Sequence, residues 1–250
     1  MKVLILGASD SAGTSLPDPS RSWRAILERE LPPLVGEAVE VPHARLYTYV
    51  PGSVGFASRQ IEAHQPDVVV VAATVVGFAY PTVAGRVRHL SGWRAGRWME
   101  RHSQSWEMHD QQDWGRARRR LYRIAQTTAR RTIGVAGMSS FEQTLADYEA
   151  LIERVAREEQ IHGIIMGATH PSGAMLASAP DSPALIDRFN TALEAKTVGR
   201  RFDWVDRQGM RAALAAEAML GDGLHKTPSF HRRIADTLLP LLARQHGAGR

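Results

Sequence analysis

Residues 3–13 read Val-Leu-Ile-Leu-Gly-Ala-Ser-Asp-Ser-Ala-Gly, an apolar run that breaks into a turn at Gly7. Four consecutive apolar residues followed by glycine and small polar residues are typical of a buried strand that enters a tight turn. A second run, Val-Val-Val-Val-Ala-Ala at residues 68–73, is wholly apolar and mostly β-branched. Because strands covered on both faces of a sheet need such continuous apolar runs, the two runs predict a parallel sheet.

The rest of the chain alternates between short apolar runs and segments of helical spacing. Further strands are expected at residues 38–41, 133–136, 163–166 and 201–205. The expected helices are residues 22–31, 55–64, 121–131, 139–159, 182–196 and 228–243. Strands separated by helices indicate β-α-β crossovers, so the prediction is an α/β fold with helices on both faces of a parallel sheet. We expect one domain over residues 1–250, because a single core of this size is common.

One segment breaks this rhythm and is rich in arginine and tryptophan. Residues 85–131 contain Trp93, Trp98, Trp106 and Trp114 among many basic residues, while the whole chain carries a net charge of +5. Stacking and charge could serve single-stranded nucleic acid. Tryptophan at this density more often covers apolar surface with arginine packed on it, so we interpret the segment as an insertion or lid and expect no nucleic-acid partner.

Composition excludes several chemistries. The chain has no cysteine, which removes disulfides, cysteine-ligated zinc and a thiol nucleophile. The first apolar run is too short for a signal peptide, and no run approaches a membrane span. His102 and His109 lie in the basic segment without a ligand cluster, and no H-E-x-x-H motif is present. We therefore expect a cytoplasmic protein with no membrane partner, no metal and no cofactor.

The turn at residues 7–13 permits two chemistries. Its glycine spacing is similar to a dinucleotide-binding loop, in which backbone amides approach a pyrophosphate. Asp10 stands where the middle glycine would be, and its carboxylate would repel phosphates. Alternatively, Ser9 on a tight turn after a strand could act as a nucleophile, with its own amide directed at a developing oxyanion. That alternative requires a base elsewhere in the chain.

A candidate base lies near the other end of the sequence. Gly221-Asp222-Gly223-Leu224-His225 precedes the last expected helix, and its glycines indicate an exposed turn. An imidazole can take a proton from a serine hydroxyl, and a carboxylate can hold the imidazole in the right tautomer. Asp222 and His225 could supply both groups from one loop, although an Asp and His at this spacing also occur by chance.

Taken together, the two ends resemble the GDSL, or SGNH, hydrolase family. The family opens with a strand and G-D-S-[LIV]-[ST]-x-G, whose spacing residues 7–13 match, with Ala8 in place of Asp. It closes with D-G-x-H before a final helix, as at residues 222–225. The resemblance implies a flavodoxin-like three-layer α/β/α sandwich and ester hydrolysis through an acyl-enzyme. It also implies that Ser9 is the nucleophile, His225 the base and Asp222 the orienting carboxylate, with Ser11 as the fallback nucleophile.

The resemblance also suggests an oxyanion hole. Its donors would be the Ser9 amide, a glycine matched best by Gly55 and second by Gly52, and a side chain after the third strand. The family has Asn there, in a G-x-N-D motif, whereas this chain has Val76, whose side chain cannot donate a hydrogen bond. Either Thr74 or another group compensates, or the enzyme is slow, or the chain has lost hydrolysis.

Three other polar residues have competing interpretations. His170 follows a strand and could line the site, but a structural role is also consistent with its position. His231 is expected on a face of the last helix, and Asp206 is expected to cap a helix rather than replace Asp222. The leading prediction is a carboxylic-ester hydrolase acting on a small-molecule ester, or an acyltransferase if water is excluded. A catalytically weak binding protein of the SGNH fold and a Rossmann-type dinucleotide oxidoreductase are the alternatives.

Overall fold

The computed structural model describes residues 1–96, 98, 128–129 and 131–248. They form two compact units, one made of Met1–Val75 with Glu142–Arg250 and the other of Val76–Phe141. The predicted lid at residues 85–131 falls largely outside the described residues, as does the helix expected at residues 121–131. The lid therefore stays a prediction.

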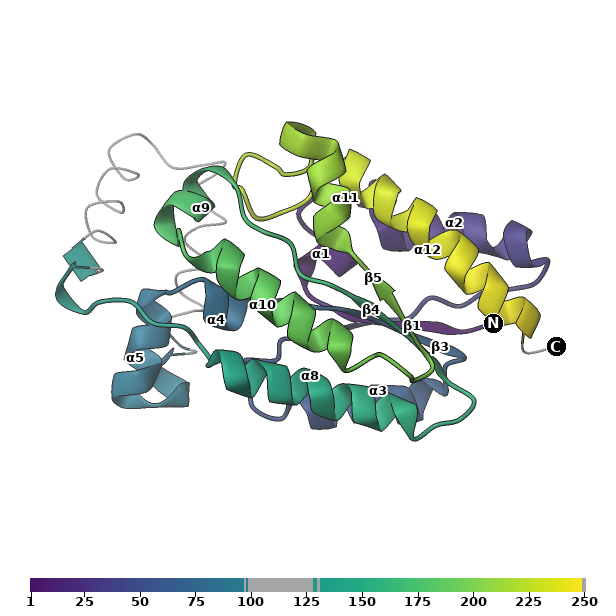
Figure 1. Cartoon of the computed structure of the whole chain (residues 1–250), viewed down its shortest axis with the longest axis horizontal. Helices are drawn as coiled ribbons and strands as arrows, with labels where there is room; N and C mark the ends of the chain where they lie inside the picture. Colours follow the sequence, from purple (N-terminus) through teal and green to yellow (C-terminus); the bar gives the residue numbers. More distant parts are fainter. Residues whose placement is uncertain (97, 99–127, 130, 249–250) are drawn as a thin grey trace. The chain divides into compact units, whose positions relative to one another are not determined.

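A parallel five-stranded sheet forms the centre of the first unit (Figure 1). Its spatial order is β2-β1-β3-β4-β5, and every neighbouring pair is parallel. This flavodoxin-like order reverses direction between β1 and β3, and ligands of such sheets bind beyond the strand carboxyl ends at that point. The strands are β1 (Val3–Gly7), β2 (His43–Arg45), β3 (Val68–Ala72), β4 (His162–Met166) and β5 (Phe202–Val205).

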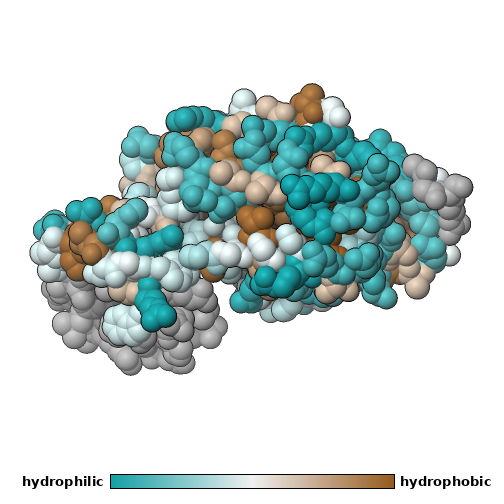
Figure 2. Space-filling view, turned by 90° about the horizontal axis from the view of Figure 1, so that it is seen from below, coloured by the Kyte–Doolittle hydropathy of each residue, from teal (hydrophilic) through white to brown (hydrophobic). Residues whose placement is uncertain are grey.

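Helices cover both faces of the sheet and complete the predicted three-layer α/β/α architecture (Figure 1). One layer contains α2 (Trp23–Val35), α11 (Arg207–Leu214) and α12 (Pro228–Ala248). The other contains α3 (Ser53–His64), α8 (Phe141–Ala156) and α10 (Ser182–Ala195). On the side of α3 and α8, the described surface is mostly hydrophilic, as expected for the outer faces of amphipathic helices (Figure 2).

Alternation along the strands divides the core between the two layers. Val3 and Ile5 belong to one buried cluster with Trp23 of α2 and Phe230 of α12. The intervening strand residues point to the opposite face, because successive side chains of a strand alternate. There, Tyr148 of α8 and Phe189 of α10 meet edge to face, with ring centroids 5.6 Å apart.

Short helices complete the description. In the first unit they are α1 (Ser9–Ala12), η1 (Pro19–Arg21), α9 (Gly173–Ser178) and η2 (Ala215–Glu217). The second unit contains α4 (Val76–Ala79) and α5 (Val83–Ser91). No helix among the described residues combines the length and apolar character needed to cross a membrane.

Three predicted elements need correction. The strand expected at residues 38–41 forms instead at His43–Arg45, because only there does the chain pair in register with Ile5–Gly7 of β1. The run at 133–136 forms no strand and contributes only an isolated bridge from Ala136 to Thr82. The helix expected to stop before Pro32 continues to Val35 and ends at Gly36, which has the left-handed φ of 73°. Proline removes its own N–H donor but can still accept bonds, and the Gly36 amide donates to the Pro32 carbonyl.

Candidate active site

The turn between β1 and α1 presents Ser9 at the carboxyl edge of the sheet. β1 ends at Gly7, and Ser9 is the first residue of the short helix α1. A Cβ on Gly7 would lie 2.1 Å from the Ser11 hydroxyl oxygen, so this close turn requires glycine. Gly13, at φ 68°, ends α1 in the left-handed conformation that favours glycine. The local structure therefore explains why glycine occupies both of these motif positions, Gly7 and Gly13.

Backbone contacts fix the conformation of the loop before α12. The Leu220 amide donates to the His225 carbonyl over 2.7 Å, which closes the turn. Gly223 has a φ of 72°, and a Cβ there would lie 2.0 Å from the carbonyl oxygen of Ser172. The Ser172 amide in turn donates to the Gly223 carbonyl over 2.8 Å. The loop after β4 thus supports the loop that carries Asp222 and His225.

Two hydrogen bonds connect the three predicted triad residues. His225 Nδ1 donates to Asp222 Oδ2 over 2.5 Å, which leaves Nε2 with its lone pair. The Ser9 hydroxyl lies 3.2 Å from that Nε2 and can donate to it. Asp222 Oδ1 accepts the amides of Leu224 at 2.9 Å and His225 at 3.0 Å. The carboxylate is therefore oriented by its own loop and in turn orients the imidazole.

Electrostatics support this assignment of protons. The hydrogen bond to Asp222 raises the pKa of His225, and it outweighs the opposing effect of burial. Burial alone would raise the pKa of Asp222, but the bonds from His225 and the two loop amides lower it well below its usual range. Asp222 is thus a stable carboxylate facing an imidazole whose protonated form it stabilises.

A second polar contact joins the same two loops. Asp10, directly after Ser9, forms an ion pair with Lys226, directly after His225. From the sequence alone, Asp10 stands out only as an obstacle to phosphate binding, and Lys226 does not stand out. Opposite charges at the positions after the proposed nucleophile and base are the signal that could have indicated the contact.

The three candidate oxyanion donors, at Ser9, Gly55 and Thr74, have different surroundings. Ser9 begins α1, and first-turn amides have no intrahelical acceptor. Gly55 is exposed in the first turn of α3, which Gly52 precedes with a φ of 80°. The Thr74 amide donates to the Tyr148 hydroxyl oxygen over 2.8 Å, so that amide is already engaged. Burial raises the pKa of Tyr148 to about 12 and keeps its hydroxyl protonated.

Val76 belongs to the second unit, where it begins α4. Its apolar side chain has no hydrogen-bond donor, so the family's Asn has no counterpart there. Thr74 lies two residues beyond β3, in the same unit as the proposed triad. The bond from its backbone amide to Tyr148 does not involve its side-chain hydroxyl. Assignment of Ser9, Gly55 and Thr74 to an oxyanion hole remains a prediction.

Among the other polar candidates, His170 and Asp206 have structural partners, whereas Ser11 does not. Ser11 is buried and its hydroxyl contacts no hydrogen-bond partner among the described residues. The ring of His170 is held by Gln208 at Nδ1, over 3.0 Å, and by Asp187 at Nε2, over 2.6 Å. Asp206 accepts the Gly209 amide over 3.0 Å and caps α11, which confirms the expected capping role.

His231 is fully buried in α12, as a packing residue would be. Its Nδ1 accepts the first amide of α2, from Trp23, over 3.2 Å. Burial lowers the pKa of His231 to about 4, so the ring is neutral and serves as an acceptor for α2. The structure gives it a role in joining α2 to α12.

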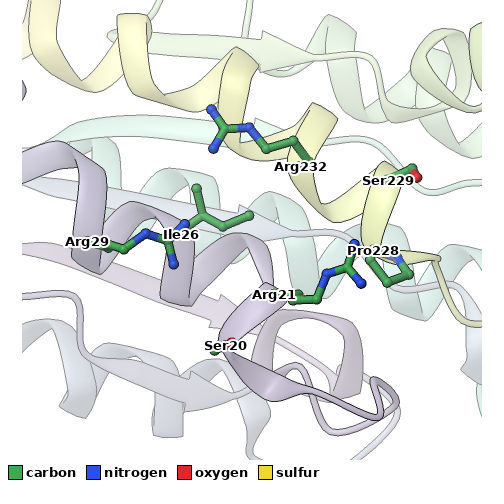
Figure 3. Close-up of a pocket in the computed structure, with 7 residues that line it drawn as sticks. All are labelled: Ser20, Arg21, Ile26, Arg29, Pro228, Ser229 and Arg232. Atoms are coloured by element: carbon green, nitrogen blue, oxygen red, sulfur yellow. The ribbon is translucent and has the colours of Figure 1, made fainter.

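A pocket of about 450 Å³ lies between α2 and α12 and does not include the Ser-His-Asp set (Figure 3). Three arginines, Arg21, Arg29 and Arg232, line it. Arg29 and Arg232 both bind Glu30, and Arg232 also binds Asp236. Because these carboxylates neutralise much of the positive charge, the pocket is a weak candidate for an anion site. Elsewhere in the described part of the chain, no three or more His, Cys, Asp or Glu residues group as a metal site.

Comparisons with known proteins agree with this fold. No protein-family model matches the sequence, and no curated protein is detectably similar to it. Solved structures are similar over nearly the whole chain. TesA matches at a TM-score of 0.57 and 15% identity, covering 98% of this chain and 99% of its own.

Two further structures have named organisms. A psychrotrophic esterase, EstA, from Pseudoalteromonas sp. matches with a TM-score of 0.55 and 12% identity over 97% of both chains. A putative SGNH hydrolase from Slackia heliotrinireducens matches with a TM-score of 0.52 and 15% identity, covering 96% of this chain and 97% of its own. The chain therefore has the fold of the SGNH hydrolases that its terminal motifs resemble.

Proposed function

We propose that this protein is a carboxylic-ester hydrolase in which Ser9, His225 and Asp222 form a catalytic triad. The observation that carries the proposal is the unbroken path of hydrogen bonds from the Ser9 hydroxyl through His225 to Asp222. The three residues come from opposite ends of the chain, and Ser9 and His225 are 216 positions apart. The names of similar structures support the same activity, since they include esterases and a lipase.

In this proposal, acylation begins with the serine hydroxyl. Ser9 Oγ attacks the ester carbonyl carbon while His225 Nε2 accepts the hydroxyl proton. Asp222 stabilises the resulting imidazolium and remains ionised, as its lowered pKa requires. When the tetrahedral intermediate collapses, the bond to the alcohol oxygen breaks. His225 returns the proton to that oxygen, which leaves an acyl group on Ser9.

Deacylation reverses these roles with water as the nucleophile. His225 takes a proton from water, the hydroxide adds to the acyl carbon, and Ser9 leaves with the proton that His225 holds. In both halves the negative charge on the carbonyl oxygen needs donors. We assign these donors to the amide of Ser9, the amide of Gly55 and the hydroxyl of Thr74.

Hydrolysis of p-nitrophenyl acetate tests the proposal. The wild type is expected to release p-nitrophenol, while Ser9→Ala and His225→Ala should each lose about 10⁴-fold or more in kcat. Ser11→Ala is the matched control, because it removes a neighbouring hydroxyl of the same turn that has no partner among the described residues. Ser9→Ala activity equal to that of the wild type would refute the assignment.

A further inference from the structure

The side chains of Asp10 and Lys226 meet behind the proposed reacting atoms. Each follows a triad residue directly, and they form an ion pair across 216 positions of sequence. Their side chains are only 16% and 8% exposed, so water screens the pair weakly. Lys226 is also tied to its own loop, through a bridge between its backbone and Met219.

The ion pair of Asp10 with Lys226 constrains both of the elements that it joins. Ser9 and Asp10 both lie in the four-residue helix α1, so fixing the Asp10 carboxylate fixes the start of that helix. Lys226 and His225 are neighbours in the loop before α12. The ion pair therefore joins the element that carries the nucleophile to the loop that carries the base. The contact between Ser9 and His225 is 3.2 Å long and depends on how these two elements meet.

We propose that Asp10 and Lys226 are positioning residues, whose ion pair holds His225 Nε2 within reach of the Ser9 hydroxyl. The proposal rests on the proposed function, because it assigns a role to residues next to that triad. The pair also balances charge beside the imidazole. A carboxylate near His225 favours imidazolium and an ammonium disfavours it, so the ionised pair leaves little net field.

Several charged groups surround this part of the site. Asp222 from the same loop, Asp10 from α1 and Lys226 face the His225 imidazole. Arg207 from α11 and the neutral His231 from α12 also interact electrostatically with Asp10. Arg207 is itself engaged, since its guanidinium donates to the carbonyls of Gly167 and Ala73. The Arg207 guanidinium therefore already has acceptors at the ends of β3 and β4.

Neutralising each partner separately distinguishes positioning from simple stabilisation. Asp10→Asn leaves the Lys226 ammonium beside His225 and is expected to lower the pKa of His225. Lys226→Gln leaves the Asp10 carboxylate and is expected to raise it. The Asp10→Asn/Lys226→Gln double variant removes both charges and should return the pKa toward the wild-type value. The opposite shifts show that both charges act on the ring. Positioning shows in kcat, which a pair that only stabilised the fold would leave at the wild-type value in folded protein.

The experiment combines kinetics of p-nitrophenyl acetate hydrolysis with NMR titration of the His225 ring, which needs no activity. Each single variant should lose roughly 10- to 100-fold in kcat, since displacing a catalytic group by about 1 Å can cost about 10²-fold. The double variant should keep most of that loss although its pKa returns, because the ion pair that positions the ring is still missing. Glu149→Gln is the matched control, because it breaks a lysine–carboxylate pair with Lys196 that joins α8 to α10.

The outcomes separate the two proposals. Wild-type kcat in both single variants would overturn the positioning role, as would full recovery of kcat in the double variant. Equal activity of the wild type and Ser9→Ala would instead overturn the proposed function, and the positioning role with it. Thermal unfolding of each variant sets an assay temperature at which all of them are folded, so a folding defect is not mistaken for either result.

Discussion

The two halves of the proposed site differ in how closely they follow the family pattern. On the side of the nucleophile and base, Ser9, His225 and Asp222 stand at the motif positions and are connected by hydrogen bonds of 3.2 and 2.5 Å. On the side of the oxyanion, the family's Asn is replaced by Val76, and the amide of Thr74 is engaged by Tyr148. The proposed proton-transfer half therefore matches the family's motifs, whereas the proposed charge-stabilising half departs from them.

This difference separates two requirements of ester hydrolysis. Proton transfer needs one geometry of three side chains and tolerates little variation. An oxyanion needs donors at the right distance, and backbone amides, hydroxyls and carboxamides can all serve. A substitution at the third strand can therefore be compensated locally, whereas one at Ser9 or His225 cannot. The predictions below test each half in turn.

The largest effect is expected at the carboxylate. Asp222→Asn should lower kcat for p-nitrophenyl acetate by about 10⁴-fold, because the neutral amide no longer selects the tautomer that leaves Nε2 free. KM should change little, since Asp222 does not contact the substrate in this mechanism. A loss below about tenfold would indicate that His225 is oriented by another group. Asp206→Asn, which alters a helix cap, is the control.

The second-largest effect is expected at Thr74, in the proposed oxyanion hole. Thr74→Val removes the hydroxyl proposed as an oxyanion donor while keeping the shape of the side chain. It should lower kcat by about 10²- to 10³-fold, as loss of one oxyanion donor typically does. Thr74→Ser should retain most of the activity. Thr237→Val, on the exposed side of α12, is the matched control. Full activity in Thr74→Val would show that the Ser9 and Gly55 amides suffice.

The pH dependence of ester hydrolysis tests the proposed role of His225 as the catalytic base. The base form of His225 is required, and its pKa is raised above the usual 6.5 by the bond to Asp222. Activity should therefore be full above that pKa and fall about tenfold per pH unit below it. The midpoint of the kcat/KM profile should lie above pH 6.5. A midpoint below that value would contradict the charge assignment at His225.

The smallest catalytic effect is expected at Tyr148. Tyr148→Phe removes the oxygen that accepts the Thr74 amide, leaving a part-buried donor without its partner. This should lower the free energy of unfolding by about 1–3 kcal/mol, with only a minor change in kcat. Denaturant unfolding measures the first and the ester assay the second. A kcat loss as large as that of Thr74→Val would mean that Tyr148 positions the hydroxyl of Thr74.

Local patterns were sufficient to predict most of the sheet. The runs that become β1, β3 and β4 are continuous and apolar, and each is buried as such runs require. β2 lies outside its predicted run because it is short and on the sheet edge, so its position depends on the register with β1 rather than on its own composition. The helix α2 continues through its proline pair for a similar reason, since packing against α12 outweighs local propensity.

The candidate site likewise has residues that short motifs predict and contacts that no short motif predicts. Ser9, Asp222 and His225 stand in short motifs with glycines whose turns have recognisable spacing. The ion pair of Asp10 with Lys226 joins residues from opposite ends of the chain, and no local pattern reports such a contact. The engagement of Arg207 with the ends of β3 and β4 is similarly a product of the folded sheet. Contacts of this kind follow from topology, which periodicity alone does not specify.

Covalent labelling with a fluorophosphonate probe, followed by peptide mass spectrometry, tests most directly whether Ser9 is activated by His225. We expect a single adduct on Ser9 in the wild type, with labelling at least about 10³-fold slower in His225→Ala, since an unassisted serine hydroxyl is a poor nucleophile. An adduct on Ser11 or another residue, or equal rates in the two proteins, would contradict it.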